Sequence, residues 1–248
     1  MQGWKIFVHA LSMVVRNWRE ALRIALLPTA LGAVAFVVVG VALPQSHSAS
    51  GEVAARGPMI LAGLISVLIW VLAMAWMLVN WHRFILLSEY PSGWLPPLRR
   101  DAIGAYLWRL VQMILMVIVA LIPFVVLMVI LGGLTGVLQM IWVGLMAYGF
   151  YRISPILPAA AVGETLGIRA AWDATRPGAG AIVIIIILSM VVTKLASVID
   201  VLLTGSIPVL GAILSIMLTA ALGLLNASIL TTIYGYYIDG RPLGDASD

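Results

Sequence analysis

The sequence contains no cysteine and very few charged residues. The absence of cysteine among 248 residues excludes disulfides, iron–sulfur clusters and thiol chemistry. Charged residues make up only 10% of the chain, against about 25% in soluble domains, whereas 63% of its residues are hydrophobic. A chain with so few polar groups cannot cover a surface that faces water. The composition therefore predicts an integral membrane protein.

Histidine is also rare, and no catalytic or metal-binding motif is visible. His9, His47 and His82 lie in three different segments, which disfavours a metal cluster. The acidic residues expected on the cytoplasmic side follow no recognisable catalytic pattern; they are Glu89, Asp101, Glu164 and Asp173. We therefore expect no enzyme activity, no metal and no other cofactor. Phosphotransfer to lipid is an alternative that stays open, because arginines surround these acids.

Six apolar segments are long enough to cross a bilayer. About 20 apolar residues span the hydrocarbon core, and runs that are continuously apolar favour helices over barrel strands. The first run is too long for the apolar region of a signal peptide. The sequence thus predicts an all-α, polytopic membrane helical bundle that forms a single domain over residues 1–248. The expected spans are residues 21–43, 59–80, 108–131, 134–151, 180–203 and 207–235.

Basic residues are concentrated on one side of these spans. Twelve of the 14 lysines and arginines precede the odd-numbered spans or follow the last span, whereas only Arg56 lies on the opposite side and Lys194 lies inside a span. Cytoplasmic loops of membrane proteins carry an excess of lysine and arginine. Both termini are therefore expected in the cytoplasm.

Three cytoplasmic segments have the pattern of amphipathic helices that lie on the membrane surface. In the first, Trp4, Phe7 and Leu11 recur at helical spacing opposite a basic face, an arrangement that suits the headgroup region. Each such segment precedes an outward span and a return span, which indicates three repeated units. The residues expected to contact lipid headgroups are Lys5, Arg16, Arg19, Arg99, Arg100, Arg169 and Arg176.

Two ionisable residues fall inside the fifth span. Asp200 is near its outer end, but Lys194 lies about 13 Å deeper than that end, where a charge costs roughly 2.5–3.5 kcal/mol. Their six-residue separation does not bring the two side chains together. We therefore expect Lys194 to find a partner on another helix, in a buried polar site formed by Lys194, Asp200, Gln139, Ser215 and Asn226.

Other roles for Lys194 remain open at this stage. It can serve as a structural contact to neighbouring helices, bind a lipid headgroup, a ligand or a partner subunit, or take part in transport. Coupled transporters usually carry several ionisable groups within their spans, and here only Lys194 is deep.

Small residues recur every four positions in the last two spans. Span five has Ser189, Thr193 and Ser197, and span six has a longer stripe of the same spacing that includes Gly211 and Gly223. Small residues let helices approach closely in lipid. We expect the two stripes to face each other, because a short loop joins the two spans.

The stretch "RISPILPAAAVGETLGIRAAWDATRPG" resembles bacterial six-span inner-membrane proteins. It is similar to YciC-like proteins and to the membrane domain attached to glycerophosphodiester phosphodiesterases. The resemblance implies a helical bundle in the bacterial inner membrane, and it does not carry over the phosphodiesterase activity. The matching positions are Arg152, Ser154, Pro158, Ala159, Ala171, Trp172, Thr175 and Arg176.

These features predict a non-catalytic inner-membrane protein. We expect it to associate with lipid, in particular anionic lipid, or with a larger membrane complex as an accessory subunit, and we expect no nucleic-acid partner. The alternative is a small permease or transport component with a polar site around Lys194.

Overall fold

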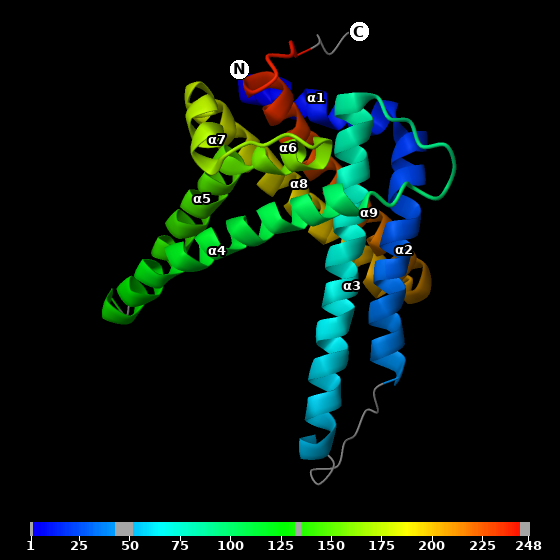
Figure 1. Ribbon diagram of the computed structural model, residues 1–248. Coiled ribbons are helices and arrows are strands. Elements are labelled where there is room, and N and C mark those ends of the chain that lie inside the picture. Colours follow the sequence, from blue (N-terminus) through cyan, green and yellow to red (C-terminus); the bar gives the residue numbers. More distant parts are fainter. Residues whose placement is uncertain (1, 43–51, 132–134, 244–248) are drawn as a thin grey trace.

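The computed structural model describes residues 2–42, 52–131 and 135–243, and these residues form helices joined by loops (Figure 1). Among them, six helices are long and apolar enough to cross a membrane, which confirms the predicted membrane helical bundle. The helices are α1 (Gln2–Arg16), α2 (Trp18–Ala42), α3 (Glu52–Leu87), α4 (Arg100–Leu131), α5 (Thr135–Ile153), α6 (Ile156–Val162), α7 (Ile168–Ala174), the 3-10 turn η1 (Arg176–Gly178), α8 (Ala179–Ser206) and α9 (Pro208–Tyr237).

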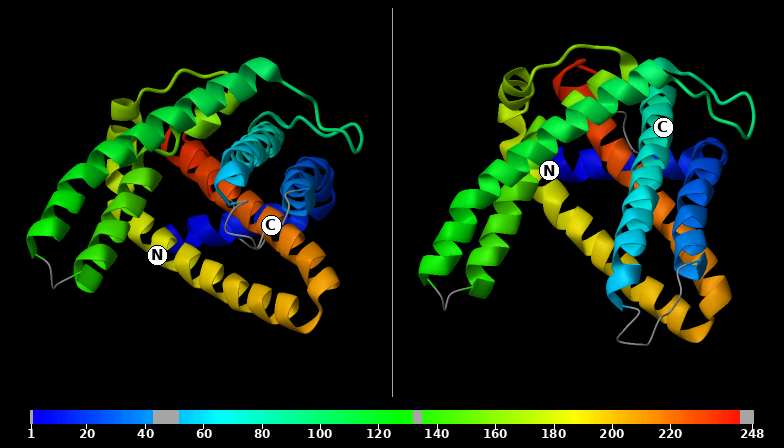
Figure 2. Two further views of the ribbon diagram at one scale, coloured as in Figure 1. Left: turned by 90° about the horizontal axis from the view of Figure 1, so that it is seen from below. Right: turned by 60° about the horizontal axis from the view of Figure 1, so that its bottom comes forward.

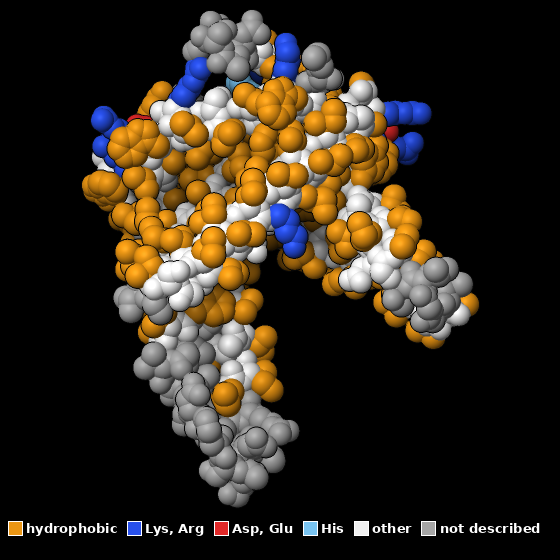
Figure 3. All heavy atoms as spheres, turned by 180° about the vertical axis from the view of Figure 1, so that it is seen from behind, with side chains coloured by type: hydrophobic (Ala, Val, Ile, Leu, Met, Phe, Trp, Pro, Cys, Tyr) orange, Lys and Arg blue, Asp and Glu red, His pale blue; other side chains and the backbone are white. Residues whose placement is uncertain are grey.

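The long helices form three hairpins, which are α2–α3, α4–α5 and α8–α9. Helix α9 is central, since it packs against α1, α2, α3, α6 and α8. The α4–α5 hairpin diverges from the α2–α3 hairpin, so the two form separate arms (Figures 1 and 2). The short helices α1, α6 and α7 lie together at one end of the bundle. We call this the basic end, because most of the Lys and Arg side chains in Figure 3 gather towards it.

The buried core is concentrated near the basic end. Trp81, Met77 and Ile229 are fully buried there. Two side-chain hydrogen bonds join α3 to α9 in this region: Trp81 Nε1 donates to Ser228 Oγ at 2.8 Å, and His82 Nδ1 lies 2.7 Å from Thr231 Oγ1. Farther from the basic end, large apolar side chains point outward, as a lipid environment favours.

Helix α1 packs on the α8–α9 hairpin. Its buried residues are Gly3, Ile6, Phe7 and Ala10, and a Cβ atom at Gly3 would lie 2.4 Å from the carbonyl oxygen of Ala181. Helix α1 is therefore amphipathic, but part of its apolar side packs against other helices and part of it is exposed. Phe7 faces protein, whereas Trp4 and Leu11, which were expected on the same face, are exposed.

The second expected surface helix does not exist as a separate element. Residues 100–109 form the first turns of α4, and α4 continues to Leu131. The only proline in α4 is Pro123, far along the helix, so nothing breaks the helix between its basic start and its apolar continuation. By contrast, α7 is separate from α8, because Pro177 and Gly178 interrupt the chain in the η1 turn.

The small-residue stripes of α8 and α9 do not face each other along their length, so that prediction is wrong. Thr193 and Ser197 are exposed, and α8 packs through Ala196 instead. On α9, a Cβ at Gly223 would contact Met77 of α3 at 3.1 Å. Small residues do permit close packing here, but they face different helices: Gly223 faces α3, whereas Gly211 lies against Leu203 of α8.

A glycine of α2 lies against an indole of α3. A Cβ at Gly32 would lie 2.5 Å from the Trp70 ring. In the same region Ser66 Oγ donates to the carbonyl of Ala35 at 3.2 Å, and the Phe36 and Trp70 rings meet edge to face at 5.9 Å. Glycine thus lets an indole lie against the backbone of α2.

We expect Gly32→Ala to destabilise the protein by about 1–3 kcal/mol, because the added methyl group displaces Trp70. The control is Gly63→Ala on α3, where a Cβ meets nothing within 4 Å and alanine favours the helix. Thermal unfolding in one detergent compares the two variants with the parent protein. Equal stability of both variants would contradict the close Gly32–Trp70 packing.

Candidate functional site

The five residues of the predicted polar site do not form a site. Lys194 and Gln139 are exposed on different helices, and Ser215 donates to the carbonyl of Gly211 in its own helix. Within the described residues, no hydrogen bond or ion pair joins any two of the five. The residues predicted to face lipid headgroups are all exposed, as that role requires; these are Lys5, Arg16, Arg19, Arg99, Arg100, Arg169 and Arg176.

Asn226 instead belongs to a small cluster around Tyr151. The Tyr151 hydroxyl lies 3.3 Å from Asn226 Oδ1 and 3.3 Å from Ser189 Oγ, so it links α5 to α8 and α9. Tyr151 sits in the sequence "YGFYR", which resembles "YGYYI" near the end of α9. That shared pattern is the sequence signal that singles out this tyrosine.

Arg152 is the most buried charged residue among those described, with 4% of its surface exposed. Its Nε donates to Thr175 Oγ1 at 2.8 Å and its Nη1 donates to the Tyr148 hydroxyl at 2.8 Å, while Nη2 donates to the carbonyl of Trp172. The guanidinium carbon also lies 4.2 Å from the centre of the Trp172 ring. Arg152 thus ties α5 to α7 and to the residue that follows it.

Among the described residues, the hydrogen-bond and aromatic partners of Arg152 are all neutral. A buried guanidinium is stabilised by hydrogen bonds and by aromatic faces, which disperse its charge. Arg152, Trp172 and Thr175 are among the positions that carry the resemblance to six-span bacterial proteins, and they meet in space. Their shared role is structural, since they hold the α7 segment against the end of α5.

A second arginine cluster holds the loop between α3 and α4. Arg83 makes a paired contact with Glu89, from Nε to Oε2 at 3.0 Å and from Nη2 to Oε1 at 2.6 Å. Arg99 adds an ion pair to Glu89 at 2.7 Å, and Arg83 Nη1 also donates to the carbonyl of Ala161 in α6. The hydrogen bond from Arg83, followed by the charges of Arg83 and Arg99, lowers the pKa of Glu89.

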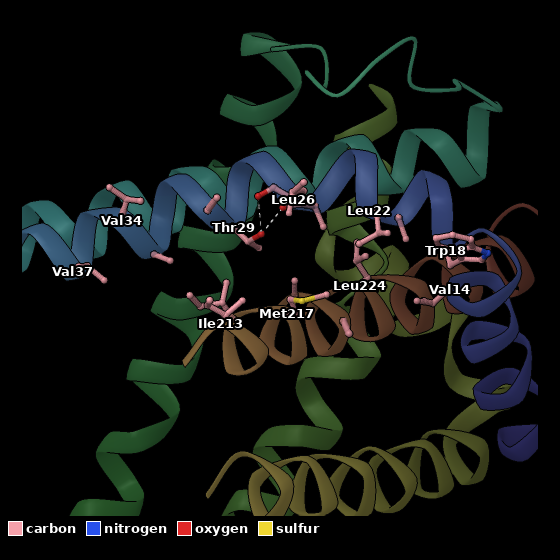
Figure 4. A pocket seen from close by; sticks show the side chains of 17 residues that line it. Val14, Trp18, Leu22, Leu26, Thr29, Val34, Val37, Ile213, Met217 and Leu224 are labelled. Atoms are coloured by element: carbon pink, nitrogen blue, oxygen red, sulfur yellow. Dashed lines mark hydrogen bonds between the residues drawn. The ribbon is translucent and has the colours of Figure 1, made fainter. Parts of the chain in front are cut away.

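An apolar groove of about 610 Å³ runs between α2 and α9 (Figure 4). This volume is in the range of pockets that hold small molecules, about 300–1,000 Å³. Side chains of the two helices point towards one another across it, with Trp18 at one end and Val37 and Ile213 at the other. Both walls belong to candidate membrane spans, so the groove faces hydrocarbon when the protein is in a bilayer.

The inside of this groove offers a ligand almost no polar group. Thr29 is the one hydroxyl among the lining side chains, and its Oγ1 donates to the carbonyl of Ala25 at 2.5 Å. Since that hydroxyl is already bonded within α2, the groove suits a hydrocarbon chain rather than a polar solute.

The end of the groove nearest the basic end is different. Trp18 is 55% exposed there, and the guanidinium carbon of Arg19 lies 5.3 Å from the centre of its ring. An indole beside an arginine is typical of the membrane interface, where it meets headgroups. The groove thus joins an apolar channel to a basic, aromatic mouth.

A second apolar groove, of about 460 Å³, lies between α4, α5 and α7. Its lining includes Met116, Val117 and Phe150, with Arg169 and Trp172 on α7. It therefore repeats the combination of an apolar channel with an arginine and a tryptophan. The side chain of Arg169 is 97% exposed, and its Nε lies 4.0 Å from Asp173 Oδ2.

Comparison of the chain with protein-family models, with curated proteins and with solved structures finds no match. The resemblance to YciC-like proteins and to the membrane domain of glycerophosphodiester phosphodiesterases therefore stays a prediction. The α2–α9 groove is the candidate functional site.

We expect Arg152→Lys to lower stability by about 1–3 kcal/mol, because an ammonium group cannot make the three diverging bonds of the guanidinium. Hydrogen exchange should rise in α7, and the unfolding temperature should fall. Arg169→Lys is the control, since its side chain is almost fully exposed. A parent-like exchange rate in the Arg152→Lys variant would show that Arg152 does not hold α7.

We expect the stabilising effect of Glu89 to disappear at acidic pH. Its lowered pKa means that the folded state binds fewer protons than the unfolded state. The contribution is therefore present above the ordinary pKa of 4.5 and is lost as pH falls through the lowered value. At pH 7, Glu89→Gln should lower the free energy of unfolding by at most about 1 kcal/mol, because the ion-pair cluster is partly exposed. The unfolding temperature should fall accordingly. A difference in unfolding temperature between the two proteins that does not shrink as the pH falls below 4.5 would contradict this account.

Proposed function

We propose that the protein is a non-catalytic, multi-pass protein of the bacterial inner membrane that binds phospholipid. One acyl chain occupies the α2–α9 groove, and the phosphate lies beside Trp18 and Arg19. The observation that carries the proposal is the continuity of the two parts, an apolar channel that ends at an exposed indole stacked with a guanidinium.

The chemistry of a phospholipid matches each part of the groove. Its chain needs an apolar surface without unsatisfied polar groups, and the lining around Thr29 supplies one. Its phosphate needs a cation, and its glycerol ester region can accept a hydrogen bond from an indole. The excess of basic residues at this end supports an anionic lipid of the cytoplasmic leaflet, with both termini in the cytoplasm.

The second groove supports the same function from an independent part of the chain. Arg169 and Trp172 line this groove, although Trp172 stacks on Arg152 and not on Arg169. The permease alternative has less support. Lys194 and Gln139 are exposed on separate helices and share no hydrogen bond within the described chain, so they offer no polar site for a solute.

The test is native mass spectrometry of the protein released from vesicles that contain equal amounts of phosphatidylglycerol and phosphatidylcholine. We expect the parent protein to retain phospholipid, with an excess of phosphatidylglycerol. Ala30→Trp fills the groove and should reduce the amount of retained phospholipid several-fold. A loss of 1.4 kcal/mol in binding free energy corresponds to about a tenfold loss of affinity. Arg19→Gln should leave a bound lipid but abolish the preference for phosphatidylglycerol.

Two positions outside the groove serve as controls. Ala105→Trp adds the same indole to the surface of α4, and Arg109→Gln removes a charge from that helix. Both should retain lipid as the parent protein does. Unchanged retention in Ala30→Trp, or equal losses in Ala30→Trp and Ala105→Trp, would overturn the assignment of the groove.

A further inference from the structure

One side of α8 is exposed along most of the helix and is apolar except at its middle. Lys194 is exposed on this side, between Met190 one turn before it and Val198 one turn after it. The stripe continues to Ile187 and Val201, both exposed. The opposite side, which includes Ile182, Ile185 and Ala196, is buried in the bundle. We call the exposed stripe the Lys194 face.

Lys194 is far from both ends of its helix. At 1.5 Å per residue, it lies about 22 Å from Ala179 and about 18 Å from Ser206 along the axis. Helical side chains lean towards the N-terminus, so the stem of Lys194 points away from the nearer end. The apolar neighbours on both sides place this ammonium group in the hydrocarbon region.

The bundle itself supplies no partner to Lys194. Among the described residues, no hydrogen bond or ion pair is made by its ammonium group, and its side chain points away from the neighbouring helices that α8 packs against. A charge exposed in the hydrocarbon region is strongly unfavourable unless an opposite charge or a polar group meets it. The exposed side of α8 around Lys194 therefore requires an acidic or polar group from another molecule.

We propose that the Lys194 face binds a transmembrane helix of another membrane protein, and that this helix carries an aspartate or glutamate at mid-membrane depth. The carboxylate of the partner pairs with the ammonium group of Lys194. Exposed Thr193 and Ser197 flank Lys194, and their small size lets a second helix approach closely. The apolar residues above and below Lys194 supply the remaining contact.

A second copy of this chain is a poorer occupant. In a parallel, symmetric pair built on this face, the two Lys194 side chains would meet at the same depth and repel each other. Asp200 is six residues, about 9 Å, farther along α8 and cannot face Lys194 at equal depth. A lipid phosphate is also disfavoured, because Lys194 lies far from both ends of α8 and its stem leans away from the nearer one.

The experiment uses the full chain in vesicles and a synthetic probe, a leucine-rich transmembrane peptide with one central glutamate. A matched peptide carries glutamine instead. Energy transfer between labelled protein and labelled peptide measures their association. We expect the glutamate peptide to bind about tenfold more tightly than the glutamine peptide, a preference in the range of polar contacts between membrane helices.

The preference should disappear in Lys194→Met and persist in Lys194→Arg, which keeps the charge. Ser206→Lys, on the same helix but at its end, serves as an added comparison for charge outside the hydrocarbon region. Equal binding of the two peptides to the parent protein would overturn the proposal, and so would a glutamate preference that survives in Lys194→Met.

Two further readouts identify the competing occupants. Loss of retained phosphatidylglycerol in Lys194→Met, without a peptide preference in the parent, would assign the face to lipid and overturn the proposal. Energy transfer between two labelled copies that depends on Lys194 would assign it to self-association, with the same consequence. Neither result bears on the α2–α9 groove, because its walls are α1, α2 and α9 and do not include α8.

Discussion

The structure depends on one property of the bilayer: lipid tails solvate an apolar side chain as well as a protein interior does. Helices that meet in hydrocarbon therefore gain little from burying leucine or valine, and they associate through close packing and hydrogen bonds. The Gly32–Trp70 approach and the bonds of Trp81 and His82 to α9 are contacts of this kind. Away from the basic end, the α4–α5 and α2–α3 hairpins diverge (Figure 2).

The same property explains why the buried core lies near the basic end. Near water, an arginine can enter the protein at a modest cost, and its donors then join several segments at once. Arg152 and Arg83 do this, the first between α5 and α7 and the second between α3, α6 and the loop before α4. Away from this end the helices separate, and the grooves between them open to hydrocarbon.

Two kinds of exposed surface result, the apolar grooves and the Lys194 face, and they differ in chemistry. The grooves are apolar channels with cations only at the mouth, so they complement a molecule with one charged end. The Lys194 face has its charge at the centre, so it complements a helix with a buried acid. We infer that the bundle meets lipid and protein through different surfaces, which lets each be altered without the other.

The sequence by itself determined the number of membrane helices and roughly where each lies in the chain, because hydropathy is a local property. It did not determine their lengths, since α3 and α4 extend well beyond the expected spans. It also singled out the motif around Arg152 and Trp172, but not the bonds that join them. Only the tertiary structure decided that Lys194 is exposed, that Gly223 faces α3 and that the start of α4 is continuous with its span. These outcomes depend on the rotation of each helix about its axis and on its neighbours. In a chain that is apolar on nearly all sides, hydrophobic periodicity cannot specify that rotation, and contacts between residues distant in sequence must do so.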